Sequence, residues 1–176
     1  WYKSMSESDS NSNQRLINAY KNMLEHLRVL MDKAQDVKPE VLHALDTAKE
    51  KVVEVGELTR EEAEKISDYI IRDLHDAADF VEENRTEFND WISLETDLIE
   101  DKILDLLPPL IDETRLALDQ LKHRAETMGE WHTGEIVSPG VFECKSCGKK
   151  LEMHKSGHIP PCSGCKATVF KRVRTP

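Results

Sequence analysis

The sequence contains few aromatic residues, few glycines and prolines, and no long apolar run. Aromatic residues make up 6% of the 176 residues, and glycine and proline number seven each. These are too few turn-forming residues for a β-sandwich or a low-complexity linker. No stretch approaches the roughly 18 consecutive apolar residues of a membrane-spanning helix, so we expect no membrane span. With 33% charged residues, the composition is typical of long helices with solvated outer faces.

The first 14 residues are rich in serine and asparagine and lack the apolar segment of a secretion signal. Trp1 to Ser4 precede Met5 and resemble residues left from cloning. We therefore expect residues 1–14, those four included, to form a disordered lead. We also expect the protein to be cytoplasmic.

The formal net charge of −10 conceals a division along the chain. Residues 1–128 contain 16 Lys/Arg and 30 Asp/Glu, a net charge of −14, whereas residues 129–176 contain 8 and 4, a net charge of +4. From Cys144 onward, eight basic residues stand against the single Glu152, a net charge of +7. Because phosphate binding requires a basic surface, we predict that nucleic acid is bound by the C-terminal part or not at all.

Apolar residues recur at the three- and four-residue steps of amphipathic, coiled-coil-like helices. These stripes cover residues 16–30, 41–55, 63–81 and 99–128, the last interrupted by Pro108-Pro109. Each stripe covers a third of its helix at most, so the helices must bury their seams against one another. The sequence predicts a mainly α fold, an elongated antiparallel helical hairpin or bundle over residues 15–129. A seam left over is a candidate surface for a homodimer.

Several residues predict where these helices begin and end. Pro39 is suited to the first turn of the second helix, and Gly56 to the C-cap that follows it. Thr59 and Glu62 have the spacing of a capping box at the start of the third helix. Gly129 ends the last stripe.

All four cysteines lie in the basic C-terminal part. Cys144 and Cys147 form one C-x-x-C pair, and Cys162 and Cys165 form another. Each pair turns two thiolates toward one metal, and two pairs complete a tetrahedron that suits Zn²⁺ or, less often, iron. Short alternating segments typical of strands flank the pairs, and Gly148 follows the first pair, where a tight turn favours positive φ. The sequence predicts a structural four-cysteine zinc site in a small β zinc ribbon over residues 130–176.

Other uses of the cysteines fit less well. Disulfides are not expected without a secretion signal, and a redox C-x-x-C would follow a strand and open a helix. His154 and His158 lie between the pairs, but four cysteines already fill the shell, so we predict that both are solvent-side loop residues. A shell filled by four cysteines leaves no position for water or substrate. Since no nucleophile or phosphate-binding motif is present either, we expect no enzymatic activity.

A second metal site can be drawn from Asp73, His75, Asp76 and Asp79, because positions 75 and 79 lie on the same helical face. A solvated helix face is the favoured interpretation. The basic tail offers a different candidate surface, for nucleic acid or a protein partner, in which Phe170 would stack on bases. Its candidate contact residues are Lys149, Lys150, Phe170, Lys171, Arg172 and Arg174.

Trp131, His132 and Glu135 lie between the last helix and the ribbon. We interpret them as a joint, in which Trp131 packs the ribbon against the last helix. A binding or catalytic patch is the alternative interpretation.

Three segments in this order resemble the bacterial YbeL-like zinc-ribbon-containing family. They are Gly56-Glu-Leu-Thr-Arg60 before a long helix, the segment from Trp131 to Glu135, and the paired C-x-x-C ribbon. The resemblance runs from about residue 15 to the C-terminus. It implies a helical N-terminal part, a zinc ribbon and a cytosolic bacterial protein of unassigned function, with ligands at Cys144, Cys147, Cys162 and Cys165. The second pair departs from the usual form of the family at Ser163, Gly164 and Lys166.

Three functions remain open. The first is a non-catalytic adaptor or regulator whose acidic helical body binds a protein partner that the ribbon docks or orients. The second is binding of RNA or DNA, for example on a ribosome, by the basic ribbon. The third is regulation of RNA polymerase, since its secondary-channel factors also join a helical hairpin to a four-cysteine finger. Asp76-Ala-Ala-Asp79 does not match the acidic tip motif of those factors and lies within the third predicted helix.

Overall fold

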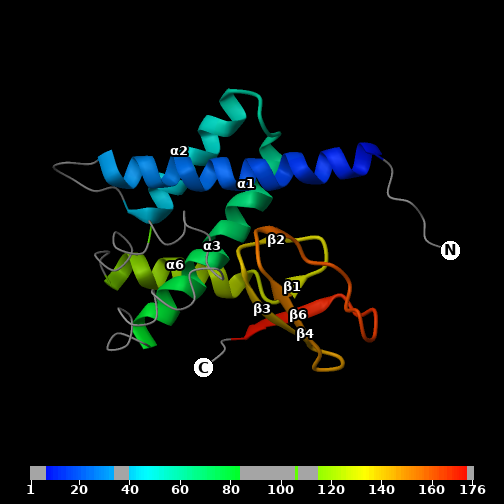
Figure 1. Ribbon diagram of the computed structural model, residues 1–176. Helices are drawn as coiled ribbons and strands as arrows, with labels where there is room; N and C mark the ends of the chain where they lie inside the picture. The colour runs from blue at the N-terminus through cyan, green and yellow to red at the C-terminus, as the bar shows by residue number, and fades with distance from the viewer. Residues whose placement is uncertain (1–6, 34–39, 84–105, 107–114, 174–176) are drawn as a thin grey trace.

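The computed structural model describes residues 7–33, 40–83, 106 and 115–173 (Figure 1). Within these ranges the helices are α1 (Glu7–Lys33), α2 (Val41–Glu54), α3 (Arg60–Glu83) and α6 (Arg115–Thr127). The strands are β1 (Trp131–His132), β2 (Ile136–Val137), β3 (Gly140–Cys144), β4 (Lys150–Met153), β5 (Gly157–His158) and β6 (Val169–Val173). The predicted architecture of a mainly helical body followed by a small β zinc ribbon is confirmed.

The helical body is held together by the apolar stripes that the sequence predicts. In Figure 1, α1 runs across the upper part of the view below the end of α2, α3 descends past it, and α6 lies beside α3. Tyr20, Met23 and Leu27 of α1 are fully buried, as are Ile66 and Ile70 of α3. Burial of such side chains contributes about 1.5–3 kcal/mol each, so these seams supply the main stabilisation of the body.

The predicted end of the second helix and the predicted start of the third are confirmed. Gly56 adopts a φ of +74°, the left-handed conformation of a helix C-cap. The Thr59 amide donates to Glu62 Oε2 (3.0 Å), and the Glu62 amide donates to Thr59 Oγ1 (3.2 Å). Val55 is 58% exposed although it falls on the predicted stripe, because α2 ends at Glu54. Pro39 and Pro108-Pro109 lie outside the described residues.

The prediction of a disordered lead is wrong for residues 7–14, because α1 begins at Glu7. Serine and asparagine are weak helix formers, but extending a helix that tertiary packing already holds costs little compared with nucleating one. Arg15 pairs with Glu62 of α3 (2.5 Å), and His158 of β5 lies 3.4 Å from the Asn13 carbonyl. These contacts hold the first turns of α1 against the rest of the protein. Residues 1–6 lie outside the described residues.

The last predicted stripe is described only in part. Leu121 and Ala125 are buried on α6, as predicted, and Gly129, with a φ of +68°, follows the end of the helix. Leu116 is 64% exposed. Of residues 99–114 only Leu106 is described, and it is buried.

The ribbon is built from two small antiparallel sheets. One has the strand order β1-β6-β3-β4, and the other pairs β2 with β5. The side chains of neighbouring residues in a strand point to opposite faces. The two residues of β2 therefore pack in two different cores. Ile136 packs in the helical core, whereas Val137 packs with Phe142 and Phe170 in the ribbon core. The ribbon is therefore separate in sequence but continuous with the body in packing.

We predict that Ile70→Ala destabilises the body by about 2–5 kcal/mol, because the side chain is fully buried and its removal leaves a cavity. Urea unfolding followed by circular dichroism at the helix band measures this. Leu116→Ala is the matched control and should change the free energy of unfolding by less than about 0.5 kcal/mol. Equal losses in the two variants would contradict the assignment of α3 to the core.

Candidate metal centre

The two C-x-x-C pairs form similar turns at adjacent ends of the ribbon sheet. Cys144 is the last residue of β3, and its carbonyl accepts from the Gly148 amide at 2.9 Å. The Cys162 carbonyl accepts from the Lys166 amide at 3.0 Å. Gly148 has a φ of +72° and Lys166 a φ of +63°. The positive φ predicted for Gly148 is confirmed. The second turn places Lys166 in the same left-handed conformation, which a lysine seldom adopts.

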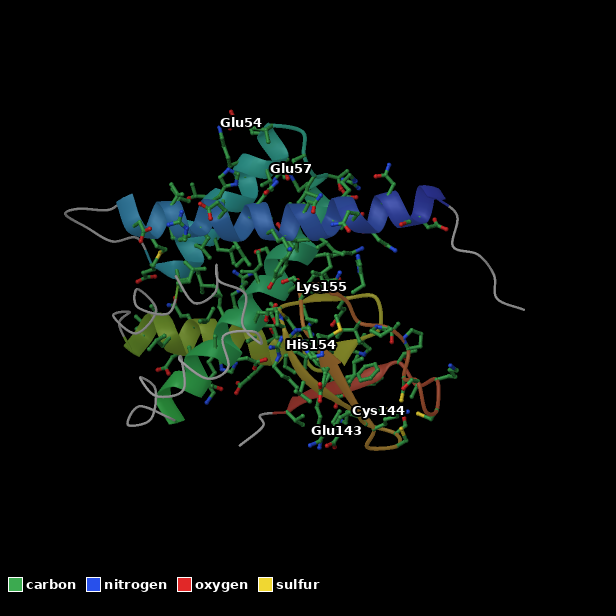
Figure 2. The ribbon with its side chains drawn as sticks, in the orientation of Figure 1. Glu54, Glu57, Glu143, Cys144, His154 and Lys155 are labelled. Atoms are coloured by element: carbon green, nitrogen blue, oxygen red, sulfur yellow. The ribbon has the colours of Figure 1, made fainter. Side chains whose placement is uncertain are left out.

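The four sulfur atoms meet in one cluster, near the Cys144 label in Figure 2. All lie within 4.8 Å of one another, with Cys144 Sγ 3.6 Å from Cys165 Sγ and Cys147 Sγ 3.6 Å from Cys162 Sγ. A disulfide needs about 2.05 Å between sulfurs, so all four cysteines are free thiols. A tetrahedron with Zn–S bonds of about 2.3 Å has edges of about 3.8 Å. The spacing fits a zinc ion held by four thiolates.

Hydrogen bonds prepare one sulfur for the metal. Donation from the Cys165 and Gly164 backbone amides lowers the pKa of the Cys162 thiol to about 6. The Lys149 amide acts in the same direction on Cys147, but the neighbouring Cys165 and Cys162 sulfurs outweigh it and raise the pKa of Cys147 to about 12. Four sulfurs this close cannot all ionise without a cation between them. All four cysteines can therefore be thiolates only when a divalent metal ion lies between them.

The alternative metal site does not assemble in the described part of the chain, where the cysteines form the sole group with metal-ligand spacing. Asp73 and Asp76 instead form ion pairs with Arg172 of β6, at 2.7 Å and 3.1 Å. His75 Nε2 lies 3.4 Å from Asp79 Oδ2 on α3. Asp73 and Asp76 are therefore paired inside the protein rather than solvated, which corrects the favoured interpretation for these two residues.

The two histidines between the cysteine pairs have different surroundings. His154 is exposed, 3.7 Å from Glu152, as predicted for a solvent-side residue. His158 is half-buried in β5, with Nδ1 2.7 Å from the Gly134 carbonyl. Because its other ring nitrogen faces α1, His158 is part of the contact between ribbon and body, and its prediction as a solvent-side residue is wrong.

Trp131, His132 and Glu135 lie where the ribbon meets the body. Glu135 Oε2 accepts from Arg72 of α3 at 2.5 Å and from the His132 amide at 2.9 Å. The Arg72 guanidinium lies 4.7 Å from the centre of the Trp131 ring. These contacts join the ribbon to α3 through Arg72, an arginine that was not identified from the sequence.

The sequence reasoning also missed the centre of this contact. Asp73 is buried on α3, where its carboxylate accepts from Tyr20 of α1 at 2.5 Å and from the Ser138 amide at 2.9 Å. Arg172 of β6 donates to the same carboxylate at 2.7 Å. We call Asp73, Tyr20, Ser138 and Arg172 the Asp73 cluster. The one sequence feature that pointed to this cluster was Arg172, a charged residue in a segment with the pattern of a strand.

Three of the six residues suggested for nucleic-acid contact are buried or paired within the protein. Phe170 is 0% exposed in the ribbon core, so it offers no stacking surface. Lys171 pairs with Glu143 at 2.9 Å, and Arg172 belongs to the Asp73 cluster. Arg174 lies outside the described residues, which leaves Lys149 and Lys150 exposed. None of the helices in the described ranges is long and apolar enough to cross a membrane.

The order of these elements, with the four-cysteine ribbon behind a helical body, agrees with comparisons to known proteins. The family described as "Zinc-ribbon containing domain" matches residues 28–174. The chain belongs to this family. It is 27% identical over 128 residues to "Uncharacterized protein YbeL" of Escherichia coli strain K12, covering 73% of this chain and 79% of that protein. The YbeL proteins of strains O6:H1 and O157:H7 match equally. No solved structure matches, and the resemblance to YbeL-like proteins is confirmed.

We predict that the purified protein contains one zinc ion per chain and that Cys147→Ser loses it, because three sulfurs leave the tetrahedron open. Elemental analysis measures the metal and separates zinc from iron. In the variant, hydrogen exchange should become fast across the ribbon strands while the helix signal in circular dichroism persists. Ser146→Ala, one residue away in the same exposed turn, should retain zinc. Retention of zinc by Cys147→Ser would contradict the site.

We further predict that Arg172→Met destabilises the zinc-loaded protein by about 3–5 kcal/mol, because it leaves the buried Asp73 carboxylate without its cation. Chemical unfolding of the single variants and of Asp73→Asn/Arg172→Met measures the coupling. The double variant should recover part of the loss. Strictly additive losses would show that the two residues act independently.

Proposed function

We propose that the protein is a non-catalytic zinc-binding adaptor or regulator. Its acidic helical body binds a protein partner, and its zinc ribbon orients that surface. The observation that carries the proposal is the Asp73 cluster, in which one buried carboxylate joins α1, α3 and the ribbon. A closed site of four cysteines supplies stability rather than chemistry, so the ribbon acts on the body by fixing its position.

The partner surface that we favour is the end of the body around the α2–α3 connection. Glu54 and Glu61 are highly exposed there, and Figure 2 shows Glu54 and Glu57 above α1 in this view and Cys144 below it. Each pairs with a lysine of its own helix, Glu54 with Lys51 and Glu61 with Lys65. Residues 1–128 nevertheless carry a net charge of −14, and such an excess of one sign steers a partner of opposite charge and adds specificity. A basic protein surface is therefore the expected partner.

Binding of RNA or DNA through the ribbon is the second candidate, supported by the exposed Lys149 and Lys150. It is weaker because Phe170 is buried and both Lys171 and Arg172 form ion pairs. The candidate role at RNA polymerase ranks below it. Asp76 and Asp79 lie within α3 rather than at the tip of a hairpin, and Asp76 pairs with Arg172.

We predict that the tagged, zinc-loaded protein captures a defined partner from a native bacterial lysate, and that nuclease treatment leaves the capture unchanged. The double variant Glu54→Lys/Glu61→Lys should lose the partner by at least tenfold, because it reverses the charge of the surface. The control Asp119→Lys/Glu126→Lys makes the same change on α6. Melting curves check that each variant is folded.

Two results would contradict the proposal. One is capture that nuclease abolishes and that falls steeply with salt, which indicates nucleic acid. The other is capture that neither charge reversal changes, which removes the acidic body as the binding surface.

A further inference from the structure

The ribbon sheet has a free edge. In the order β1-β6-β3-β4, strand β4 pairs with β3 alone, and no described strand covers its outer side. The Cys144 amide donates to the Lys149 carbonyl at 2.9 Å, so the backbone groups of Lys149 are directed toward β3. Since backbone groups alternate in an antiparallel pair, Lys150 and Glu152 direct their amides and carbonyls outward. An uncovered edge of this kind is a template for another strand.

A hollow of about 150 Å³ lies beside this edge. Its apolar lining comes from Leu151, Phe170, Pro160 and Pro161, and the rest from Lys149, Lys150, Cys162 and Ser163. Prolines offer no backbone donor, so this wall favours an apolar side chain over a polar one. The hollow adjoins β4, where it can receive one side chain of a strand added to the edge.

The charges near the edge are mainly positive, with three exposed lysines against the single exposed Glu152 of β4, and no ion pair of these lysines is seen in the described part of the chain. Lys149 and Lys150 are exposed at one end of β4, and Lys155 is exposed just past the other, where Figure 2 places it away from Cys144. In contrast, Lys145 pairs with Glu130, and Lys171 pairs with Glu143. The lysines at the edge therefore complement an acidic ligand.

From these features we infer that an extended, acidic peptide segment of a partner protein adds to β4 as a further strand. Main-chain hydrogen bonds to Lys150 and Glu152 supply affinity, the hollow takes one apolar side chain, and the lysines select acidic neighbours. The inference rests on the proposed function, because it gives the ribbon a contact of its own with a protein partner.

A peptide suits this edge better than a nucleic acid does. Single-stranded nucleic acid binds by stacking bases on exposed aromatic rings. In the described ribbon Phe142 and Phe170 are fully buried, and Trp131 packs beneath the guanidinium of Arg72. A nucleic acid also makes no use of outward backbone amides at the spacing of a β-strand.

The probe is a fluorescein-labelled ten-residue peptide of alternating glutamate and valine, titrated with the zinc-loaded full chain and followed by fluorescence anisotropy. We expect saturable binding and slower hydrogen exchange at the Lys150 and Glu152 amides. Glu152→Pro should weaken binding at least tenfold, because it removes an outward amide without removing a bond to β3. Glu152→Ala is the matched control, and it should bind as well as the unaltered protein or better. Lys150→Glu should also weaken binding, whereas Lys51→Glu on α2 should not.

Three outcomes would overturn the inference. They are no binding at a protein concentration of about 1 mM, equal binding by Glu152→Pro and Glu152→Ala, and displacement of the peptide by a 20-nucleotide oligothymidine that binds more tightly. Zinc content shows that each variant has folded. Glu152→Pro is also used to capture the lysate partner. Capture that depends on Glu54 and Glu61 but not on Glu152 would leave the proposed function standing and remove this edge.

Discussion

The ion pair between Asp73 and Arg172 is the constraint on which the arrangement of the protein depends. A carboxylate buried to 1% exposure is unfavourable unless a cation and hydrogen-bond donors surround it. Here the donors come from three places in the chain, Tyr20 on α1, Ser138 after β2 and Arg172 on β6. No two of these elements can separate while the charge stays satisfied. A polar contact therefore fixes the relative position of parts that apolar packing alone would hold less specifically.

This contact connects the metal centre to the helices. Arg172 lies in β6, a few residues after the second cysteine turn, and Cys144 pairs with Phe170 of the same strand. The sheet has almost no core of its own beyond a few side chains, so a bound zinc ion would supply most of its folding free energy. Loss of the metal would free β6, and with it the cation that Asp73 requires. A bound zinc ion would thus act on the helical body through β6.

The sequence was sufficient for features that depend on local spacing. The heptad steps placed Tyr20, Met23 and Leu27 in the core, Thr59 and Glu62 formed their capping box, and the C-x-x-C pairs formed one cluster. It was insufficient where the outcome depends on contacts distant in the chain. Asp73 and Arg172 are 99 residues apart, and each alone is typical of a solvated residue. The helical start at Glu7 was missed for the same reason, since its weak local propensity is offset by contacts with α3 and β5.

Ion pairs inside the protein also reduce the positive charge that the basic ribbon can offer to a ligand. Eight basic residues from Cys144 onward suggest a surface for phosphate, yet Lys145, Lys171 and Arg172 are each paired with a carboxylate. Arg172 is the clearest case, because its charge compensates a buried aspartate and is unavailable to any ligand. Four thiolates around a divalent ion add a net charge of about −2, which further reduces the local positive potential. What remains is a small group of lysines beside an open strand edge. This combination of a few positive charges with directional backbone groups favours recognition of a peptide over the broad attraction that nucleic acid requires.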